Sequence, residues 1–430
     1  MGCIAMKKYT DMTKAELEAE FASVQQKYNE LKAQGLSLNM ARGKPGKKQL
    51  DMVSSINDIL KSDADFSSGG VEARNYGNVD GLPAAKEYFA ELLGTKAENV
   101  FVGGNASLQL MYDVICKAFT HGLLRSEKPW AKEDKIKWIC PAPGYDRHFK
   151  ITETFGVEMI PVPLKEDGPD MDLVEQLAMD SSVKGMWCVP KYSNPDGVVY
   201  SDEVIERIAS LKHAAPDFTL MWDNAYCVHE FKGDFLPFQD ILSECEKHGN
   251  ADMVFEFAST SKITLPGAGI SCFACSKANM EYMKKLINIQ TIGFDKVNQL
   301  RHVMFLKNRE ETLALMKRHA EILGPKFEMV TSTLEKEIAP LGIAKWRNPN
   351  GGYFISLYAM PGTAARTWQL CRDAGLVMTG AGATWPLGKD PDDSNLRIAP
   401  SLPEVEELSR AMEILCVCLK FSSLEKLLAI

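Results

Sequence analysis

Residues 218–226 read Phe218-Thr-Leu-Met-Trp-Asp-Asn-Ala-Tyr226, an apolar run that ends directly in a carboxylate. A short run that is apolar nearly throughout is typical of a strand covered on both faces, as in a parallel sheet. A carboxylate in such a place is costly unless it is paired or faces a site. The stretch therefore predicts a buried strand that delivers Asp223 and Tyr226 to a site at its carboxyl end.

The same pattern recurs on both sides of this stretch. Six more short apolar runs alternate with longer amphipathic segments, namely Val100–Val102, Ile136–Cys140, Glu158–Val162, Gly185–Val189, Met253–Phe257 and Ile270–Ala274. Such alternation is typical of an α/β fold with a mostly parallel sheet. We therefore predict a large α/β domain, residues 55–305, built on a seven-stranded sheet.

The pattern changes beyond about Phe305. The sequence there predicts a long amphipathic helix, a strand at Gly352–Leu357, a helix around Arg366–Ala374 and a terminal helix at Pro403–Phe421. These elements predict a smaller α+β domain, residues 306–430. The N-terminal helix Lys14–Gln34 has no partner of its own, so we assign residues 1–54 to the same small domain. Two domains suit a chain of 430 residues, which is long for one core.

Composition excludes several classes of protein. The apolar fraction of 45% and the charged fraction of 25% are ordinary for a globular protein. A formal net charge of −8 without a basic cluster predicts no nucleic-acid partner. No apolar run approaches the roughly 20 residues that span a bilayer, which predicts no membrane partner. Because Met1–Thr10 lacks the apolar core of an export signal, we expect a cytoplasmic protein.

The cysteines predict neither disulfides nor a metal site. There are eleven, an odd number, and most lie inside apolar runs, which is typical of buried thiols. The one CxxC pair, Cys272 and Cys275, has no second pair and no nearby histidine, so no metal is expected.

Polar side chains follow five of the predicted strands, and ligands of open parallel sheets bind beyond the carboxyl ends of the strands. They are the glycine-rich turn Gly103-Gly-Asn-Ala-Ser-Leu108, Tyr145, Asn194, Asp223 with Tyr226, and Ser259-Thr-Ser-Lys262. Taken singly, each is explained as a turn residue, a helix cap or a solvated side chain. Together they offer a phosphate cradle, an aromatic plate, an amide, a carboxylate with a phenol, and a lysine. A phosphorylated aromatic aldehyde requires that set.

The order of these motifs carries a family resemblance. Asn194-Pro-Asp-Gly197, Asp223-Asn-Ala-Tyr226, Ser259-Thr-Ser-Lys262 and Arg397 resemble the fold-type I aminotransferases, which depend on pyridoxal 5′-phosphate (PLP). Finer features resemble the type Ic aspartate aminotransferases, namely Ala41-Arg-Gly-Lys-Pro45, Gly104-Asn-Ala-Ser-Leu108, Pro143-Gly-Tyr-Asp-Arg-His148, Ser261-Lys-Ile-Thr-Leu-Pro-Gly267, Thr291-Ile-Gly-Phe-Asp-Lys-Val-Asn-Gln-Leu-Arg301 and Asn395-Leu-Arg-Ile-Ala-Pro400. The likeness extends from about Asn39 to the C-terminus.

The resemblance implies a role for each residue around the cofactor ring. Lys262 is expected to form a Schiff base with the aldehyde and later to move a proton at the substrate α-carbon. Asp223 is expected to pair with the pyridine nitrogen. Tyr226 and Asn194 would donate hydrogen bonds to the ring 3-oxygen, and Tyr145 would stack on the ring face.

The resemblance also implies how the phosphate is held. It is expected to lie against Asn105, Ala106, Ser107, Ser259 and Ser261. Many family members add an arginine about two turns after the Schiff-base lysine, but this chain has Pro266-Gly-Ala-Gly269 there, so we name Lys296 as the replacement cation. Tyr76 matches a tyrosine that reaches the phosphate of the neighbouring subunit, which implies a homodimer with shared active sites.

The implied substrates are an amino acid and a 2-oxo acid. Arg397 would hold the α-carboxylate with its planar fork, Gly43 would approach the same carboxylate, and Asn194 is assigned to the substrate site as well. Aspartate and 2-oxoglutarate follow from the resemblance alone, and their side-chain carboxylate needs a cation among Arg42, Lys44, Arg147, His148 and Lys191, between which the sequence does not choose.

Other activities remain open from the sequence. Trp346, Tyr353 and Trp385 would suit a larger pocket, as in an aminotransferase for 2-aminoadipate, kynurenine or another aromatic acid, and alanine transfer or a PLP lyase is also compatible with the fold. A PLP-binding regulator fused to a DNA-binding module is disfavoured, because the roughly 40 residues before the first motif are few and not basic.

Overall fold

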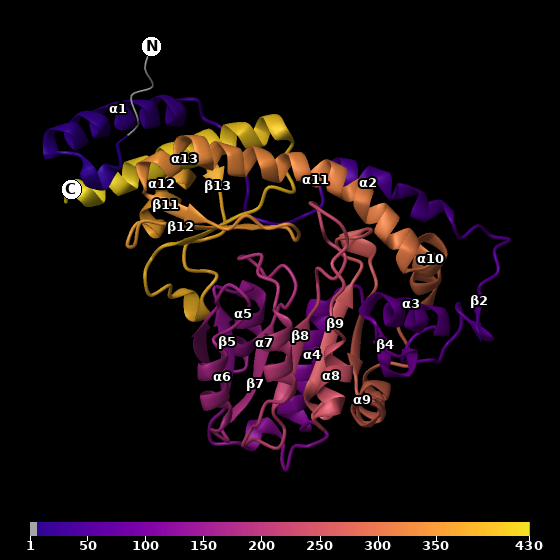
Figure 1. The fold of residues 1–430 in the computed structure, drawn as a ribbon. Coiled ribbons are helices and arrows are strands. Elements are labelled where there is room, and N and C mark those ends of the chain that lie inside the picture. The colour runs from indigo at the N-terminus through magenta and orange to yellow at the C-terminus, as the bar shows by residue number, and fades with distance from the viewer. Residues whose placement is uncertain (1–6, 430) are drawn as a thin grey trace.

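The computed structural model describes residues 7–429, and its centre is one seven-stranded sheet (Figure 1). In spatial order the strands are β4 (Val100–Val102), β10 (Ser271–Cys275), β9 (Val254–Ser259), β8 (Thr219–Asp223), β7 (Val183–Cys188), β5 (Lys137–Ala142) and β6 (Glu158–Pro163). Strands β5 to β9 pair in parallel, whereas β10 is antiparallel to both β4 and β9. The predicted mostly parallel, seven-stranded sheet is confirmed.

Helices cover both faces of this sheet, which explains why its strands are apolar nearly throughout. Helices α4 (Ser107–Thr120), α5 (Asp146–Thr154) and α9 (Lys277–Gln290) pack on one face. The other face is covered by α3 (Pro83–Leu93), α6 (Met171–Ala178), α7 (Asp202–Ala209), α8 (Ile241–Lys247) and α10 (Lys296–Leu306). Along β9, Phe255 and Phe257 point to the first group of helices, and Val254 and Ala258 point to the second.

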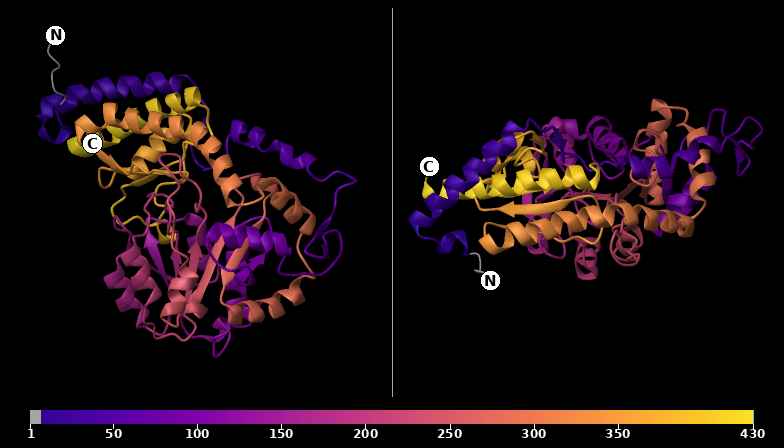
Figure 2. Two further views of the ribbon diagram at one scale, coloured as in Figure 1. Left: turned by 45° about the vertical axis from the view of Figure 1, so that its right-hand side comes forward. Right: turned by 90° about the horizontal axis from the view of Figure 1, so that it is seen from above.

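A second layer lies beyond the carboxyl ends of the parallel strands. It contains α11 (Arg309–Glu337), α12 (Ala364–Asp373), α13 (Val405–Leu428) and a sheet of β11 (Ala344–Trp346), β12 (Ile355–Ala359) and β14 (Asn395–Ile398). Helix α1 (Lys14–Ala33) lies along α13, and α11 runs beside them (Figure 2). Smaller elements are β1 (Leu38–Asn39), paired with β13 (Leu376–Val377), α2 (Lys47–Met52), β2 (Ser67–Ser68) and β3 (Val71–Glu72).

The sequence of α1 explains its place. Thr13 and Glu16 form a reciprocal capping box that starts the helix. Its buried residues, Leu17, Val24, Tyr28 and Leu31, lie on one face, and the Tyr28 ring packs 5.2 Å from Phe421 of α13. The assignment of residues 1–54 and 306–430 to one small domain, and of 55–305 to the large one, stays a prediction. Residues 1–6 of that assignment, including most of the stretch searched for an export signal, lie outside the described residues.

Two predicted elements differ from the structure by three residues or more at one end. The strand predicted at Gly352–Leu357 starts only at Ile355, because Gly352 has a φ of +83°, which lies outside the extended region of a strand. The terminal helix continues past Phe421 to Leu428, since the buried Ser422 hydroxyl bonds Thr367 of α12 at 2.7 Å.

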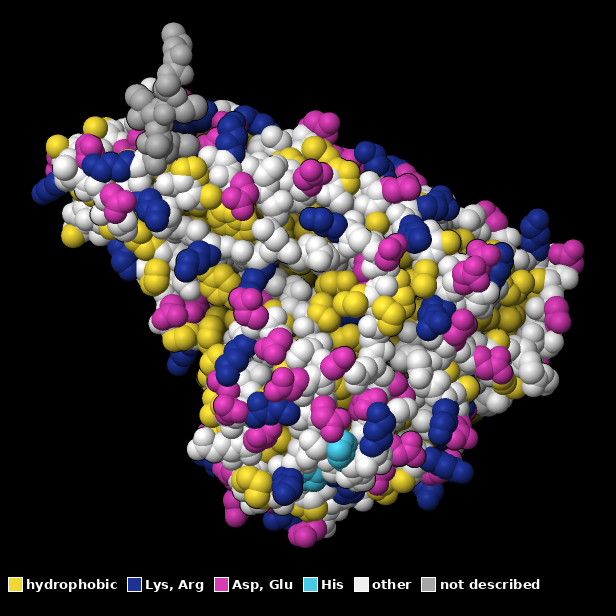
Figure 3. All heavy atoms as spheres, viewed as in Figure 1, with side chains coloured by type: hydrophobic (Ala, Val, Ile, Leu, Met, Phe, Trp, Pro, Cys, Tyr) yellow, Lys and Arg dark blue, Asp and Glu magenta, His cyan; other side chains and the backbone are white. Residues whose placement is uncertain are grey.

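Acidic and basic side chains alternate over the face shown in Figure 3, and apolar side chains gather there at the junction between the two layers. No helix within residues 7–429 is long and apolar enough to cross a bilayer. In the same range, the ten cysteines are free thiols and all but Cys116 are buried, and no group of three or more His, Cys, Asp or Glu side chains is arranged to hold a metal ion.

Candidate active site

A cavity of about 640 Å³ opens between the carboxyl ends of the parallel strands and the second layer. The predicted site residues that line it are Gly43, Ala106, Ser107, Tyr145, Asn194, Asp223, Tyr226, Ser259, Ser261, Lys262 and Arg397. Asp223 and Ser259 are the last residues of β8 and β9, and Ser107 is the first of α4. The ends of separate strands therefore meet at one site, as the strand-end argument predicts.

Asp223 has two oxygens in different surroundings. Its Oδ2 lies 2.9 Å from Nε2 of the buried His148, whose ring stacks on Trp187 with centroids 4.4 Å apart and planes 11° apart. Its Oδ1 is buried and has no hydrogen-bond partner in the described part of the chain. Because Asp223 lines the cavity, this oxygen is free to accept a hydrogen bond from a ligand. His148 lies behind Asp223, so it is not a free cation for a substrate.

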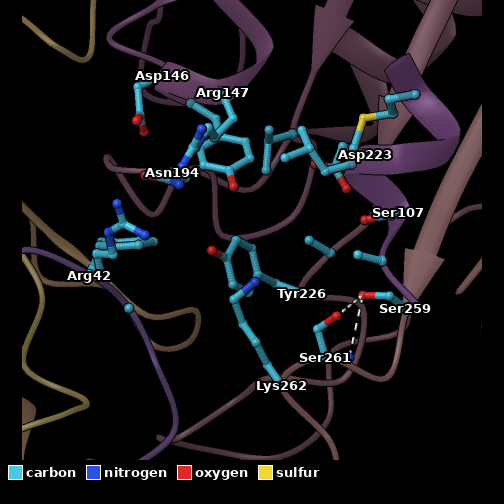
Figure 4. Close-up of a pocket in the computed structure, with 18 of the residues that line it drawn as sticks. Arg42, Ser107, Asp146, Arg147, Asn194, Asp223, Tyr226, Ser259, Ser261 and Lys262 are labelled. Carbon is cyan, nitrogen blue, oxygen red and sulfur yellow. Dashed lines mark hydrogen bonds between the residues drawn. The ribbon is translucent and has the colours of Figure 1, made fainter. Parts of the chain in front are cut away.

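Lys262 faces the same cavity as Asp223 (Figure 4). Its Nζ lies 5.0 Å from the centroid of the Tyr226 ring and 5.9 Å from that of the Tyr353 ring. Burial lowers the pKa of Lys262, and the nearby charge of Asp223 opposes that shift. A neutral amine is the nucleophilic form, so this setting favours attack on a carbonyl carbon.

One end of the cavity offers hydrogen-bond donors for an anion. Helix α4 begins there, and its N-cap residue Ala106 provides no side-chain acceptor for the first backbone amides. The hydroxyls of Ser259 and Ser261 lie 3.1 Å apart at the same end (Figure 4). Free amides at a helix start bind phosphate groups. The predicted phosphate residue Asn105 lines the adjoining cavity instead, beside Gly104 and Gly269.

Arg397 of β14 lies at the other end and is buried. Its Nη1 donates to Asp146 Oδ1 at 2.8 Å and to Asn194 Oδ1 at 3.2 Å, and its Nη2 donates to Thr379 Oγ1 at 3.1 Å. The guanidinium carbon lies 4.7 Å from the centroid of the Phe354 ring. Asp146, Thr379 and Phe354 were not predicted as site residues. Only Asp146 had a signal, since it follows Tyr145 within a quoted motif.

Four more cationic side chains line the cavity, namely Arg42, Lys44, Arg147 and Lys150. Lys150 pairs with Glu153 at 2.5 Å. No ion pair or side-chain hydrogen bond to protein engages the other three within residues 7–429. Lys191, the remaining candidate for the substrate side chain, is wrongly placed for that role, because its buried Nζ pairs with Glu230 at 2.6 Å outside this cavity.

Besides Asn105, two predicted cofactor residues, Tyr76 and Lys296, do not line the cavity of their own chain. Tyr76 is 83% exposed on the surface. Lys296 donates from Nζ to the carbonyl of Gly77 at 2.8 Å, so it holds the turn that carries Tyr76. Among the aromatic residues proposed for a larger pocket, Tyr353 is buried behind Lys262 and hydrogen-bonded to Gln49, and Trp346 and Trp385 do not line the cavity.

Known proteins share both this sequence and this fold. An aspartate amino-transferase family model matches residues 12–429. A relative from Mycolicibacterium smegmatis, designated an aminotransferase, is 45% identical over 423 residues, covering 98% of this chain and 99% of that protein. The aspartate aminotransferase of Corynebacterium glutamicum is 46% identical over 403 residues, covering 94% of this chain and 93% of that protein. A crystal structure of an aspartate transaminase from C. glutamicum has a TM-score of 0.96 at 44% identity, with 98% and 99% of the two chains covered. The chain therefore belongs to the aspartate aminotransferase family and has the fold of type I PLP-dependent transferases.

Proposed function

We propose that this aminotransferase uses PLP to exchange an amino group between aspartate and 2-oxoglutarate, giving oxaloacetate and glutamate. One observation carries the proposal. A single cavity contains the amine of Lys262, the free carboxylate oxygen of Asp223 and the guanidinium of Arg397. An amine for the aldehyde, an acceptor for a ring N–H and a fork for a carboxylate are what the reaction needs.

The residues in the cavity fit PLP. Asp223 Oδ1 would accept from the ring nitrogen, the start of α4 with Ser107, Ser259 and Ser261 would hold the phosphate, and Lys262 would hold the aldehyde carbon. When bound, PLP supplies an electron sink for the charge left on the substrate α-carbon. Lys262 Nζ would move the proton at that carbon, because its lowered pKa favours the neutral amine. Tyr145 and Asn194 would orient the ring, as the resemblance implies.

The charges at the Arg397 end support a dicarboxylate. Arg397 would hold the α-carboxylate. Arg42, Lys44 and Arg147 line the cavity without a side-chain partner among residues 7–429, so a second carboxylate would meet a cation there. Alanine has no second carboxylate to pair with these cations. Kynurenine would place a neutral ring among them, which leaves the cations without a partner. Aspartate is favoured over 2-aminoadipate by the named relatives.

Shared active sites in a homodimer complete the proposal. Tyr76, Ile289 and Ile292 are exposed by 83%, 84% and 60%. Exposed apolar side chains mark an association surface when they lie together, and here the turn after Tyr76 lies beside the loop after Ile292, since a Cβ at Gly293 would be 2.9 Å from the Gly77 carbonyl. Lys296 holds the Tyr76 turn in place through Gly77, which supports a role for Tyr76 in a partner's phosphate site. A cytoplasmic location stays a prediction.

The absorption spectrum of the purified protein tests the cofactor and the donor together. We expect absorption near the edge of the visible range, and aspartate should convert it to the shorter-wavelength amine form of the cofactor, faster than 2-aminoadipate, kynurenine or alanine at equal concentration. The Lys262→Ala variant is the control and should not convert. If aspartate fails to convert the cofactor and another amino acid succeeds, that amino acid is the donor. Release of ammonia in the absence of an oxo-acid acceptor would indicate a lyase. Cofactor binding without conversion by any amino acid would indicate a regulator.

A further inference from the structure

Arg397, the arginine proposed to bind the substrate α-carboxylate, is already paired with a carboxylate of the protein, that of Asp146. Asp146 Oδ1 lies 2.8 Å from Arg397 Nη1 inside the cavity, and the side chains are 28% and 6% exposed. Arg397 has further partners in Asn194 and Thr379, but both are neutral. Asp146 is therefore the one anion bonded to this guanidinium among residues 7–429, and it has the same chemistry as the substrate α-carboxylate.

We propose that Asp146 is a built-in competitor for the substrate α-carboxylate, bound to Arg397 in the free enzyme and displaced when substrate arrives. The inference rests on the proposed function, in which Arg397 binds that carboxylate. Two carboxylates that bind one guanidinium lie close together, and their negative charges repel each other. Binding of the substrate carboxylate at Nη1 therefore favours departure of Asp146.

The displaced carboxylate keeps a cation nearby. Asp146 is the first residue of α5 and is more exposed than Arg397, so its side chain has room to turn toward the mouth of the cavity. Arg42, Arg147, Asp146 and Asn194 lie on the same side of the cavity, away from Ser107, Ser259 and Ser261 (Figure 4). Four cationic side chains line the cavity here, namely Arg42, Lys44, Arg147 and Arg397. Asp146 and a bound dicarboxylate together bring three negative charges, so each carboxylate can have a cation.

Competition reduces the apparent affinity by the fraction of enzyme in which Arg397 is free. The alternative role, in which Asp146 holds Arg397 in the correct orientation for substrate, predicts the opposite effect of removing the charge. Thr379 provides the comparison, because it also bonds Arg397 but carries no charge, and its hydroxyl donates to the carbonyl of Ala41 in the neighbouring loop.

The test is a calorimetric titration of the cofactor-loaded enzyme with maleate, a dicarboxylate that has no amino group to transfer. We expect Asp146→Asn to lower the dissociation constant of maleate by about tenfold, which corresponds to Arg397 being free about one-tenth of the time in the native enzyme. Asp146→Glu retains the charge and should stay near the native affinity. Thr379→Val should weaken binding, because it removes a support of Arg397 without removing a competitor.

An unchanged or weaker affinity in Asp146→Asn would overturn the proposal, as would a gain of equal size in Thr379→Val. Circular dichroism and cofactor content confirm that each variant is folded and loaded, and Asp146→Ser repeats the test should Asp146→Asn not fold. Maleate binding does not require amino transfer. A failure of aspartate to convert the cofactor therefore counts against the proposed function, whereas a wrong sign in this titration counts against the competition alone.

Discussion

The two carboxylate oxygens of Asp223 have different neighbours, and this difference fits the proposed role of Asp223 as the partner of the cofactor ring nitrogen. Trp187 stacks flat on His148, so Nε2 of the imidazole is held against Asp223 Oδ2 and the other oxygen is left for a ligand. A carboxylate fixed in this way keeps a cationic N–H partner in place without having to reorient during the reaction.

Replacing Asp223 by Asn keeps the shape of the side chain and removes its charge. We expect the rate of the half-reaction with aspartate to fall by about 10²–10³-fold, the range found when one preorganised electrostatic group is removed. Lys262 remains, so the cofactor stays bound. Stopped-flow absorption checks the rate, and Asp223→Glu, which retains the charge, is the control. A rate within a few-fold of the native value would contradict the role of Asp223.

The place of a residue in the cavity could be predicted from the sequence where that residue follows a buried strand. Asp223 and Lys262 could be predicted because a polar side chain at the end of an apolar run needs a site. The pair of Arg397 and Asp146 could not, since 251 positions separate them and their meeting depends on how the two layers are placed. Lys296 was predicted as a phosphate cation from a motif alone, and in the structure it begins α10 and donates from Nζ to the carbonyl of Gly77.

Two buried histidines connect helices to the segment that follows Lys262. His319 of α11 bonds the carbonyl of Ile263 from Nε2 at 3.2 Å and receives a hydrogen bond from Gln49 at Nδ1. His302 of α10 bonds the hydroxyl of Thr264 at 3.0 Å. Burial lowers the pKa of both rings to about 4, so both are neutral at pH 7. Helices α10 and α11 thus hold the Lys262 segment through uncharged rings.

Acid should weaken this arrangement. Each folded-state pKa of about 4 lies below the ordinary value of 6.5, so the unfolded chain binds protons first. The resulting stability is complete above pH 6.5 and is lost as the pH falls to 4, by up to about 3 kcal/mol per ring. Urea unfolding across this range measures the loss. We expect His319→Gln to be less stable than the native protein at pH 7 but to lose less stability on acidification, and parallel pH profiles would contradict the argument.

The elements themselves were largely predictable, because strands covered on both faces and amphipathic helices leave clear apolar patterns. The end of α13 was not. Serine has modest helix propensity, so Ser422 and Ser423 favour a stop near Phe421, but packing against α12 extends the helix to Leu428. Tertiary contacts decided that boundary, and they are not visible in local sequence.

The proposed dimer predicts that each active site needs residues from both subunits. A site would need Lys262 of its own subunit and the tyrosine at position 76 from the neighbour. We expect Lys262→Ala and Tyr76→Ala proteins each to be weakly active or inactive, and their hybrid to regain one native site. Co-expression with two affinity tags isolates the hybrid, and its aspartate transaminase activity is the measurement.

The matched control combines Lys262→Ala with Arg397→Ala. Both side chains line the cavity of one chain, so that hybrid should contain no native site and recover nothing. Absence of recovery in the Tyr76 hybrid as well would show that Tyr76 does not act across the interface.

The position of β10 has a consequence for the nascent chain. Strand β4, which leads into the start of α4, is an edge strand whose one neighbour in the sheet is β10. β10 leaves the ribosome after Lys262, and Arg397 and α13 emerge later still. Since domains fold as units during synthesis, the predicted large domain, residues 55–305, would form the phosphate end of the ligand site before Arg397 completes the carboxylate end.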